Sequence, residues 1–212
     1  MFKPRFLLLL TILLFIYALS FSGYWKRAKA TWLSSPPKEY KVPAERKTNM
    51  QLKASEAKAF TEKNNYNQSV CFLVDMSLAS GQNRFFIYDL KKDTAQMAGL
   101  VTHGNCNEFW LNGRKYGNTA GCGCTSLGKY RIGNSYNGKF GLAFKLYGLE
   151  KTNNKAFDRF VVLHSHSCVP ASEVKGEICQ SNGCPTVSPG FLQQLKLIIT
   201  QSKKPVLLWI YE

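Results

Sequence analysis

The stretch from Ser181 to Pro189 reads SNGCPTVSP and places a cysteine between a glycine and a proline. A cysteine that only packs in a core usually has apolar neighbours, and a disulfide cysteine needs no adjacent glycine. A nucleophilic cysteine suits this setting, because flanking backbone N–H groups must face the oxyanion that forms on a substrate carbonyl. The N–H groups of Gly183 and Cys184 are the candidate donors, since Pro185 has none. The stretch therefore raises Cys184 as a candidate nucleophile.

A histidine that can serve this thiol lies in RFVVLHS, residues 159–165. The VVL run predicts a buried strand that carries His164 at its end. If the following loop folds back, this imidazole can take the proton of the Cys184 thiol, and the thiolate can attack a carbonyl. His166 is an alternative base, because alternation along a strand puts it on the same face as His164. The spacing also allows a plain strand-end histidine and a disulfide-bonded Cys184.

These two segments together resemble the paired signature of the YkuD-like L,D-transpeptidases, a strand ending in His-Ser or His-Gly followed by a Ser-x-Gly-Cys turn. Further segments resemble, in chain order, the murein L,D-transpeptidase catalytic-domain branch: FLVDMS (72–77), RFFIYDL (84–90), His103-Gly104, YGNTAGCGCTSLGKYRIG (116–133) and YNGKFGLAFKLYGLEKTNNKAFDR (136–159). The resemblance covers roughly residues 70–190. It agrees with the strand pattern, which predicts a mainly β fold, a β-sandwich or partly closed barrel with a few helices.

Carried over by position, the resemblance makes Cys184 the nucleophile and His164 the general base, with Ser165 orienting the imidazole through its backbone or hydroxyl. It also suggests residues that line the substrate cleft: His103, Arg159, Ser181, Asn182 and His166. Two features depart from the family. Asn182 stands where many relatives have histidine or tryptophan, and residues 121–126 read GCGCTS in place of a Gly-Ser/Ser-Ser segment. The extra thiols bear on substrate preference more than on the nucleophile.

The family reaction begins when the cysteine attacks the carbonyl of the L-centre at position three of a peptidoglycan stem peptide and releases the terminal D-alanine. The acyl group then passes to an amine of a neighbouring stem or to water. This chemistry needs no metal or cofactor, and carbapenem-type inhibitors become candidate acylating agents. Two alternatives remain, an L,D-carboxypeptidase or amidase, and a non-catalytic cell-wall-binding or structural protein on the same fold.

The N-terminal segment predicts export. Residues 6–25 carry no charge and are long enough to span a bilayer, and basic residues flank them on both sides. We therefore expect residues 1–30 to be a signal peptide or membrane anchor, residues 31–45 a proline-rich linker, and residues 46–212 the catalytic domain. The expected location is the periplasm or cell envelope, with residues 6–25 as an anchor in the inner membrane unless they are cleaved.

The chain of 212 residues carries a formal net charge of +15. Such a charge favours anionic partners such as lipid headgroups or cell-wall polymer. The basic residues are scattered, without a dense run interleaved with aromatics, which argues against nucleic acid. The segments expected to be regular are helices at 45–63 and 189–201 and strands at 70–77, 84–90, 95–103, 129–133, 140–149, 158–165 and 205–211, with a turn at NSYNGK (134–139).

The seven cysteines are an odd number, which in an exported protein predicts up to three disulfides and one free thiol. Cys168 and Cys179 bracket the loop between His164 and Cys184, so a bridge between them would hold that loop. Two other uses of cysteine stay open. His103, Cys106, Cys122 and Cys124 have a spacing compatible with zinc, and Cys122 with Cys124 is a possible redox dithiol.

Overall fold

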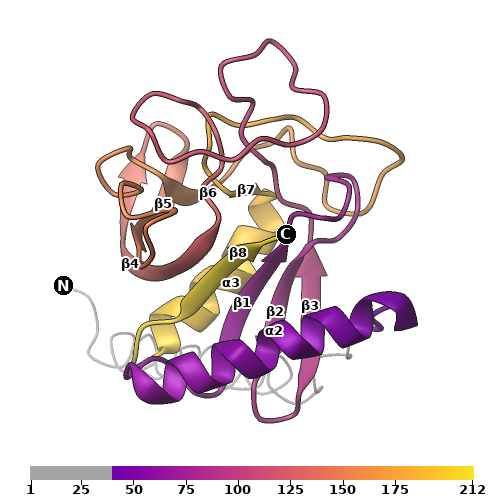
Figure 1. Ribbon diagram of the computed structural model, residues 1–212, viewed down its shortest axis with the longest axis vertical. Coiled ribbons are helices and arrows are strands. Elements are labelled where there is room, and N and C mark those ends of the chain that lie inside the picture. Colours follow the sequence, from indigo (N-terminus) through magenta and orange to yellow (C-terminus); the bar gives the residue numbers. More distant parts are fainter. Residues whose placement is uncertain (1–39) are drawn as a thin grey trace, which may run out of the picture. The chain divides into compact units, whose positions relative to one another are not determined.

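The computed structural model describes residues 40–212, which form one compact unit (Figure 1). The expected signal peptide or anchor and most of the expected linker lie outside the described residues. Within residues 40–212, none of the helices combines the length and the apolar character that crossing a membrane requires.

Eight strands and two helices make up the domain: α2 (Ala44–Lys63), β1 (Val70–Asp75), β2 (Phe85–Asp89), β3 (Thr94–Gly99), β4 (Gly128–Gly138), β5 (Gly141–Gly148), β6 (Val162–Ser165), β7 (Thr186–Val187), α3 (Pro189–Gln201) and β8 (Leu207–Tyr211). The strands form one mixed sheet in the order β3-β2-β1-β8-β4-β5-β6-β7. Only the β1–β8 and β6–β7 pairs are parallel. The mainly β fold predicted from the sequence is confirmed.

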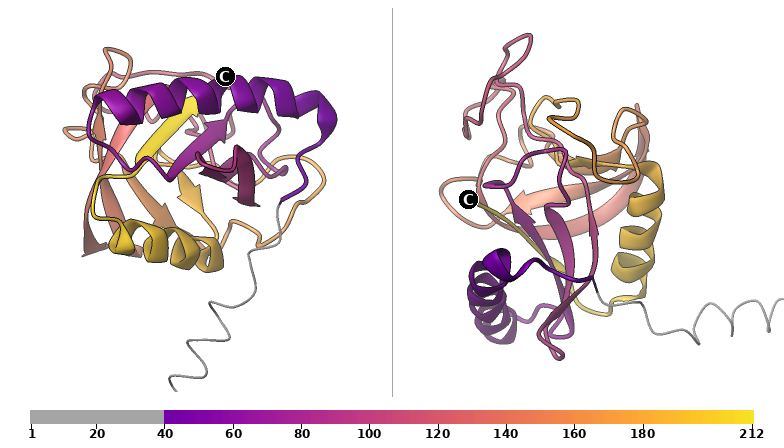
Figure 2. Two further views of the ribbon diagram at one scale, coloured as in Figure 1. Left: turned by 90° about the horizontal axis from the view of Figure 1, so that it is seen from below. Right: turned by 90° about the vertical axis from the view of Figure 1, so that its right-hand side faces the viewer.

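The central strand β8 explains why the last residues of the chain are so apolar. All five of its residues are buried, because both faces of the sheet are covered. Leu208 and Ile210 join the larger core with α3, whereas Trp209 and Tyr211 join the core beneath α2. The two helices accordingly lie on opposite faces of the sheet (Figure 2).

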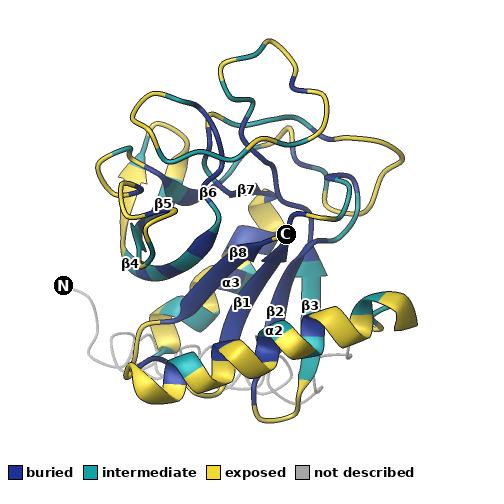
Figure 3. Cartoon of the chain, viewed as in Figure 1, coloured by how far each residue is buried: buried dark blue, intermediate teal, exposed yellow. Residues whose placement is uncertain are grey.

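Each helix buries the stripe that its sequence indicates. In α2 the buried residues are Met50, Ala54, Ala57 and Thr61, and the opposite face is exposed (Figure 3). Ser188 is the N-cap of α3, where its hydroxyl accepts the N–H of Phe191, and the first residue of the helix is a proline. Leu195 then continues the stripe into the core.

The two edges of the sheet meet at one end. Just beyond β3, Val101 forms a single antiparallel bridge with Val187 of β7. The Thr102 N–H also donates to the Thr186 carbonyl at 2.9 Å. The sheet is therefore open along most of its length and joined at this end. The join brings residues 101–104 beside residues 181–187, where the candidate nucleophile lies.

Three local expectations are corrected by the structure. The strand expected over residues 95–103 ends at Gly99, because the chain turns there toward the opposite edge. The expected turn at 134–139 is largely strand, since β4 continues to Gly138 after a register shift and only residues 139–140 form the tip. The two-residue strand β7, which carries no apolar run of its own, was not predicted.

Candidate active site

The turn that holds Cys184 depends on Gly183. The φ of Gly183 is +102°, a backbone conformation that glycine adopts readily and other residues rarely do. The Gly183 N–H donates to the Ser181 hydroxyl at 3.2 Å. This donor is therefore already engaged inside the turn. Among the hydrogen bonds of the described residues, none uses the N–H of Cys184, which leaves that N–H as the donor open to a substrate.

Hydroxyl groups fix the backbone of Cys184. Its carbonyl accepts hydrogen bonds from Ser181 Oγ at 2.7 Å and from Thr102 Oγ1 at 3.2 Å, and Thr186 Oγ1 lies 3.3 Å from it. Ser181 is itself tied to residue 103, because its N–H donates to the His103 carbonyl at 2.9 Å. The cysteine is thus held from both edges of the sheet, which suits a group that must meet a substrate in one geometry.

The Cys184 thiol faces the segment just before β6. Its Sγ accepts the Val162 N–H at 3.5 Å and lies 3.8 Å from the Phe160 carbonyl, to which the thiol donates. Burial raises the pKa of this thiol above its ordinary value, although the Val162 N–H and the Arg159 guanidinium act in the opposite direction. The thiol is therefore protonated at neutral pH unless a base removes its proton.

His164 sits on β6 with its ring held at both nitrogens. Nδ1 lies 3.1 Å from the Ser165 carbonyl, and Nε2 lies 3.0 Å from Thr186 Oγ1. A carbonyl only accepts hydrogen bonds, so Nδ1 carries the proton and Nε2 presents its lone pair. Burial lowers the pKa of His164 below its ordinary value, so the ring is neutral at pH 7 and able to accept a proton.

The second histidine of this segment has the opposite tautomer. The Cys168 N–H donates to His166 Nδ1 at 3.1 Å, so the proton of the neutral ring lies on Nε2. Neutral His166 therefore offers an N–H at its free nitrogen, where His164 offers a lone pair. This difference favours His164 over His166 as the base.

Cys184, His164 and His166 line one cavity of about 240 Å³. The remaining lining residues are Thr102, Phe140, Cys168, Gln180, Ser181, Asn182 and Thr186. Phe140, at the tip of the β4–β5 hairpin, stacks on the His164 ring with centroids 5.3 Å apart and meets the edge of His166 at 5.4 Å. No hydrogen bond between Cys184 Sγ and His164 is present among the described residues, so the thiol must rotate away from Phe160 to reach the imidazole.

The two other cleft candidates lie behind this cavity. Arg159 donates to the carbonyls of Gly117 and Cys124, at 2.9 and 2.7 Å, and supports the segment beneath Gly183. His103 is buried, with its Nδ1 3.2 Å from the Arg84 guanidinium. Burial and this guanidinium lower the pKa of His103 to about 4, so it stays neutral. Neither residue is among those that line the cavity.

The sequence did not reveal Thr102, Thr186, Phe140 or Phe160 as parts of the site. Thr102 and Phe140 come from segments far from Cys184 in the chain, and only the sheet brings them there. Thr186 gave a weak signal, since it lies two residues after the cysteine. Phe160 has a positive φ of +56°, unusual for a bulky residue, and its carbonyl is aimed at the thiol.

The cysteines form two disulfides, Cys168–Cys179 and Cys106–Cys124. The first is the bridge predicted across the loop. Cys71, Cys122 and Cys184 are free, which corrects the expectation of a single free thiol. Cys71 is buried in the core under α2, and burial strongly raises its pKa. Because Cys106 and Cys124 are joined, their sulfurs have no thiolate to offer a zinc ion, and Cys124 is not paired with Cys122.

Removing the Cys168–Cys179 bridge is expected to lower the free energy of unfolding by about 2–3 kcal/mol, because the bridge closes a short loop that is freed in the unfolded chain. Guanidinium denaturation of the Cys168→Ser, Cys179→Ser double variant measures the loss. Ser172→Ala, an exposed change in the same loop, should leave the midpoint unchanged. A loss below about 0.5 kcal/mol would show that the bridge contributes little.

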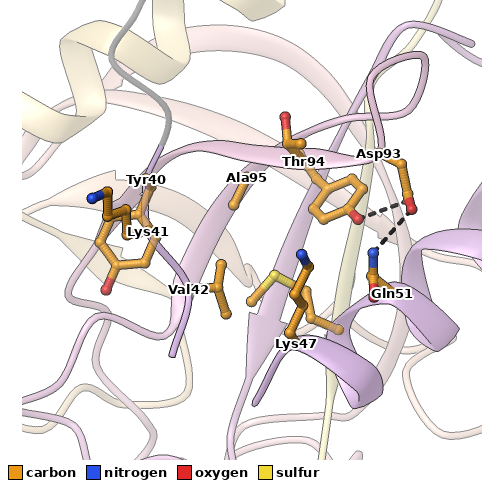
Figure 4. A pocket seen from close by; sticks show the side chains of 10 residues that line it. Tyr40, Lys41, Val42, Lys47, Gln51, Asp93, Thr94 and Ala95 are labelled. Carbon is orange, nitrogen blue, oxygen red and sulfur yellow. Dashed lines mark hydrogen bonds between the residues drawn. The ribbon is translucent and has the colours of Figure 1, made fainter. Parts of the chain in front are cut away.

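A second cavity of about 280 Å³ lies between the start of α2 and the β2–β3 hairpin (Figure 4). Its one acidic lining residue, Asp93, accepts from Tyr88 Oη at 2.8 Å and from Gln51 Nε2 at 3.2 Å. No histidine or cysteine lines it, and it shares no residue with the cavity at Cys184. The groups suited to acyl transfer are therefore in the smaller cavity.

Comparison with known proteins places these features in a family. The sequence model of the L,D-transpeptidase catalytic domain matches residues 44–211. A crystal structure of a variant of the helical cell shape determining protein Pgp2 from Campylobacter jejuni aligns with a TM-score of 0.43 and 16% identity, covering 81% of this chain and 57% of that one. The chain thus spans a little over half the length of that protein. No curated protein sequence matches the chain.

Proposed function

The chain belongs to the L,D-transpeptidase catalytic-domain family, and from this we propose that it is a cysteine-dependent L,D-transpeptidase acting on peptidoglycan stem peptides. Cys184 is the proposed nucleophile, His164 the general base and Ser165 the residue whose carbonyl fixes the base. The observation that carries the proposal is that Cys184 and His164, whose Nε2 is the unprotonated ring nitrogen, line the same cavity.

The first step is acylation. The Cys184 thiol rotates toward His164 and gives its proton to Nε2, which first exchanges its hydrogen bond from Thr186 for one from the thiol. The thiolate then forms a bond to the carbonyl carbon of the third residue of the stem. The open N–H of Cys184 donates to the oxyanion of the tetrahedral intermediate. Of the two candidate oxyanion donors, this leaves the N–H of Cys184, since the Gly183 N–H donates to Ser181 within the turn.

Release of D-alanine completes the acylation. The bond between the third residue and the terminal D-alanine breaks, and the imidazolium of His164 returns its proton to the leaving amine. The acyl-enzyme then reacts with an amine of a neighbouring stem, which forms a cross-link, or with water, which forms a tripeptide. In both cases His164 takes the proton of the attacking group, and the thiol is restored.

Incubation with a purified disaccharide-tetrapeptide tests the proposal. We expect release of D-alanine together with a cross-linked dimer, separated by reversed-phase chromatography and identified by mass. Release of D-alanine with only tripeptide would assign the protein as an L,D-carboxypeptidase. An intact tetrapeptide after prolonged incubation with a folded, reduced-Cys184 sample would contradict catalysis on this substrate and favour a binding role.

The pH dependence of acylation tests separately the proposed base, His164, and the proposed nucleophile, Cys184. With a carbapenem as probe, the wild-type rate should rise at acid pH and level off with a midpoint below 6.5, because burial lowers the pKa of His164. In His164→Ala the rate at pH 7 should fall by about 10²–10⁴. It should then keep rising tenfold per pH unit to beyond pH 9, because burial raises the pKa of the thiol.

His166→Ala is the matched control for this profile. We expect it to keep the wild-type plateau, because its free nitrogen carries a proton in the neutral ring. A His164→Ala variant that retains the plateau, or a His166→Ala variant that loses it, would move the role of base to His166.

The proposed location follows from the substrate class. A protein that acts on peptidoglycan must reach the cell envelope, and residues 6–25 are the segment proposed to take it there. We propose that residues 1–30 act as signal peptide or anchor and that residues 31–45 link them to the catalytic domain. Fractionation of cells that produce the tagged chain, with N-terminal sequencing of the product, tests both points.

A further inference from the structure

We propose that Cys106, Cys122 and Cys124 form a thiol–disulfide exchange site beside the nucleophile turn. In this site Cys106 can be bridged either to Cys124, as in the structure, or to Cys122. The family assignment concerns Cys184 and its peptide substrate, and it gives no role to this second group of sulfurs.

The three sulfurs lie close together. Cys122 Sγ accepts the Cys124 N–H at 3.4 Å. A Cβ added to Gly117 would lie 3.3 Å from Cys122 Sγ and 3.6 Å from Cys124 Sγ, so the two sulfurs flank one small space. Cys124 Sγ is in turn bonded to Cys106 Sγ. The free thiol therefore neighbours the disulfide in space as well as in sequence.

The backbone on the Cys106 side also runs beside Cys122. The Cys106 N–H donates to the Gly123 carbonyl at 3.1 Å, and Asn107 Nδ2 donates to the Gly121 carbonyl at 2.8 Å. These two hydrogen bonds bracket Cys122. The glycines on either side of it have φ values of +71° and +64°, and no atom lies within 4 Å of a Cβ added to Gly121, so the chain has room on that side of Cys122.

A cationic side chain contacts the free thiol. Arg159 Nη2 lies 3.2 Å from Cys122 Sγ and donates to it. Cys122 and Cys106 are both half-buried, so reagents can reach them. Cys71, by contrast, is fully buried in the core and has no such partner among the contacts of the described residues.

The exchange is balanced and needs no oxidant or reductant. The Cys122 thiol loses its proton to solvent, and its sulfur forms a bond to Cys106 Sγ. The Cys106–Cys124 bond breaks, and Cys124 leaves as a thiolate that takes up a proton. The loops closed by the two bridges differ by only two residues, so the chain entropy that each removes is nearly equal.

The exchange would reach the candidate active site through Cys124. Its carbonyl lies 2.6 Å from where a Cβ on Gly183 would be, and it accepts from the same Arg159 Nη2 that contacts Cys122. Releasing Cys124 from its bridge therefore loosens the support of the turn that carries Cys184. This last consequence rests on the proposed function, whereas the exchange itself does not.

Disulfide mapping of the full-length chain tests the exchange. All samples carry Cys184→Ala, so the candidate nucleophile cannot take part and a failure of the proposed function has no influence on the result. After equilibration in a glutathione buffer and acid quenching, free thiols are alkylated and non-reduced peptides are mapped by mass. With Cys124→Ser added, we expect Cys106–Cys122 in most molecules. With Cys122→Ser added, we expect Cys106–Cys124 alone.

The bridge Cys168–Cys179 serves as the internal standard in each sample, because its presence shows that the chain has folded and oxidised. Without either added substitution, alkylation of Cys124 should rise during incubation, and Cys122→Ser should stop that rise. The proposal would be overturned if Cys106 and Cys122 both stay free in the Cys124→Ser sample while the Cys168–Cys179 bridge is intact. It would also be overturned if Cys124 never becomes alkylated when Cys122 is present.

A second measurement addresses the link to Cys184. With Cys184 restored, acylation by a carbapenem should be at least about fivefold slower in Cys124→Ser than in Cys122→Ser, because only the latter keeps Cys124 bridged. Equal rates in the two variants would show that the Cys106–Cys124 bridge does not support the turn that carries Cys184. The exchange itself is tested by the disulfide mapping.

Discussion

Cys184→Ala is expected to abolish release of D-alanine from a disaccharide-tetrapeptide, with a loss of about 10⁴-fold or more in turnover. The thiol is the group proposed to bond to the substrate carbonyl, and alanine has no atom that can replace it. The turn itself should survive, because the contacts that fix it use the Cys184 carbonyl and the Gly183 N–H. The loss therefore reports chemistry and not folding. Chromatographic quantification of free D-alanine measures it.

Cys71→Ala is the matched control for removal of a thiol. Cys71 is free, like Cys184, but lies in the core beneath α2. Its replacement should cost some stability and leave turnover per folded molecule unchanged. A Cys184→Ala variant that keeps more than about a hundredth of the wild-type turnover would contradict the assignment of the nucleophile.

Gly183→Ala is expected to reduce the rate of acylation by about 10²-fold or more while Cys184 remains in place. A methyl group here would lie 2.6 Å from the Cys124 carbonyl oxygen and 3.2 Å from its carbon. The φ of +102° is also strained for any residue with a Cβ. The turn must shift to relieve both, and a displacement near 1 Å at a reacting group is enough for a loss of this size.

Gly190→Ala provides the comparison for this change. Gly190 lies in the first turn of α3, and no atom is within 4 Å of an added Cβ. Alanine is also the better helix former, so the variant should be as stable as the wild type or more so. Rates of carbapenem acylation, measured by intact-protein mass on both variants, test the expectation. Equal rates would show that the left-handed conformation of Gly183 is not required.

The sequence predicted best those helices and strands that bury one face against the core or are buried on both faces. The stripe of α2 and the wholly apolar β8 follow directly from apolar spacing. The sequence misplaced the β4–β5 turn because turn-forming residues at 134–137 lie within a strand whose register shifts. It missed β7 because two residues form a strand only when β6 and Val101 are beside them.

Five of the candidate site residues named from the sequence line one cavity: His164, His166, Ser181, Asn182 and Cys184. Cys184 and His164 were indicated by a turn and a strand end, and both line one cavity. His103 and Arg159 are not among the residues that line it. His103 contacts the Arg84 guanidinium and Arg159 donates to backbone carbonyls, and position in a motif carries no information on depth. Phe140 was missed because its stacking on His164 arises from pairing of β5 with β6, a contact between distant segments.

The two disulfides also differ in whether the sequence alone could predict them. Cys168–Cys179 was predictable because its partners bracket a single loop, whereas Cys106–Cys124 depends on hydrogen bonds between residues 104–106 and 123–125, which lie outside the strands. An odd number of cysteines gave no means of choosing which thiols stay free. In the structure the free thiol of Cys71 is buried in the core, whereas the free thiol of Cys122 contacts Arg159.

Peptide mapping of the acylated protein shows which residue is the acylating nucleophile. The protein is incubated with a carbapenem, digested and analysed by tandem mass spectrometry for the residue that carries the adduct. We expect one adduct per molecule, on the peptide with Cys184, and none in Cys184→Ala. An adduct on Cys122, or an unmodified Cys184 in a folded sample, would contradict the claim that Cys184 is the acylating nucleophile.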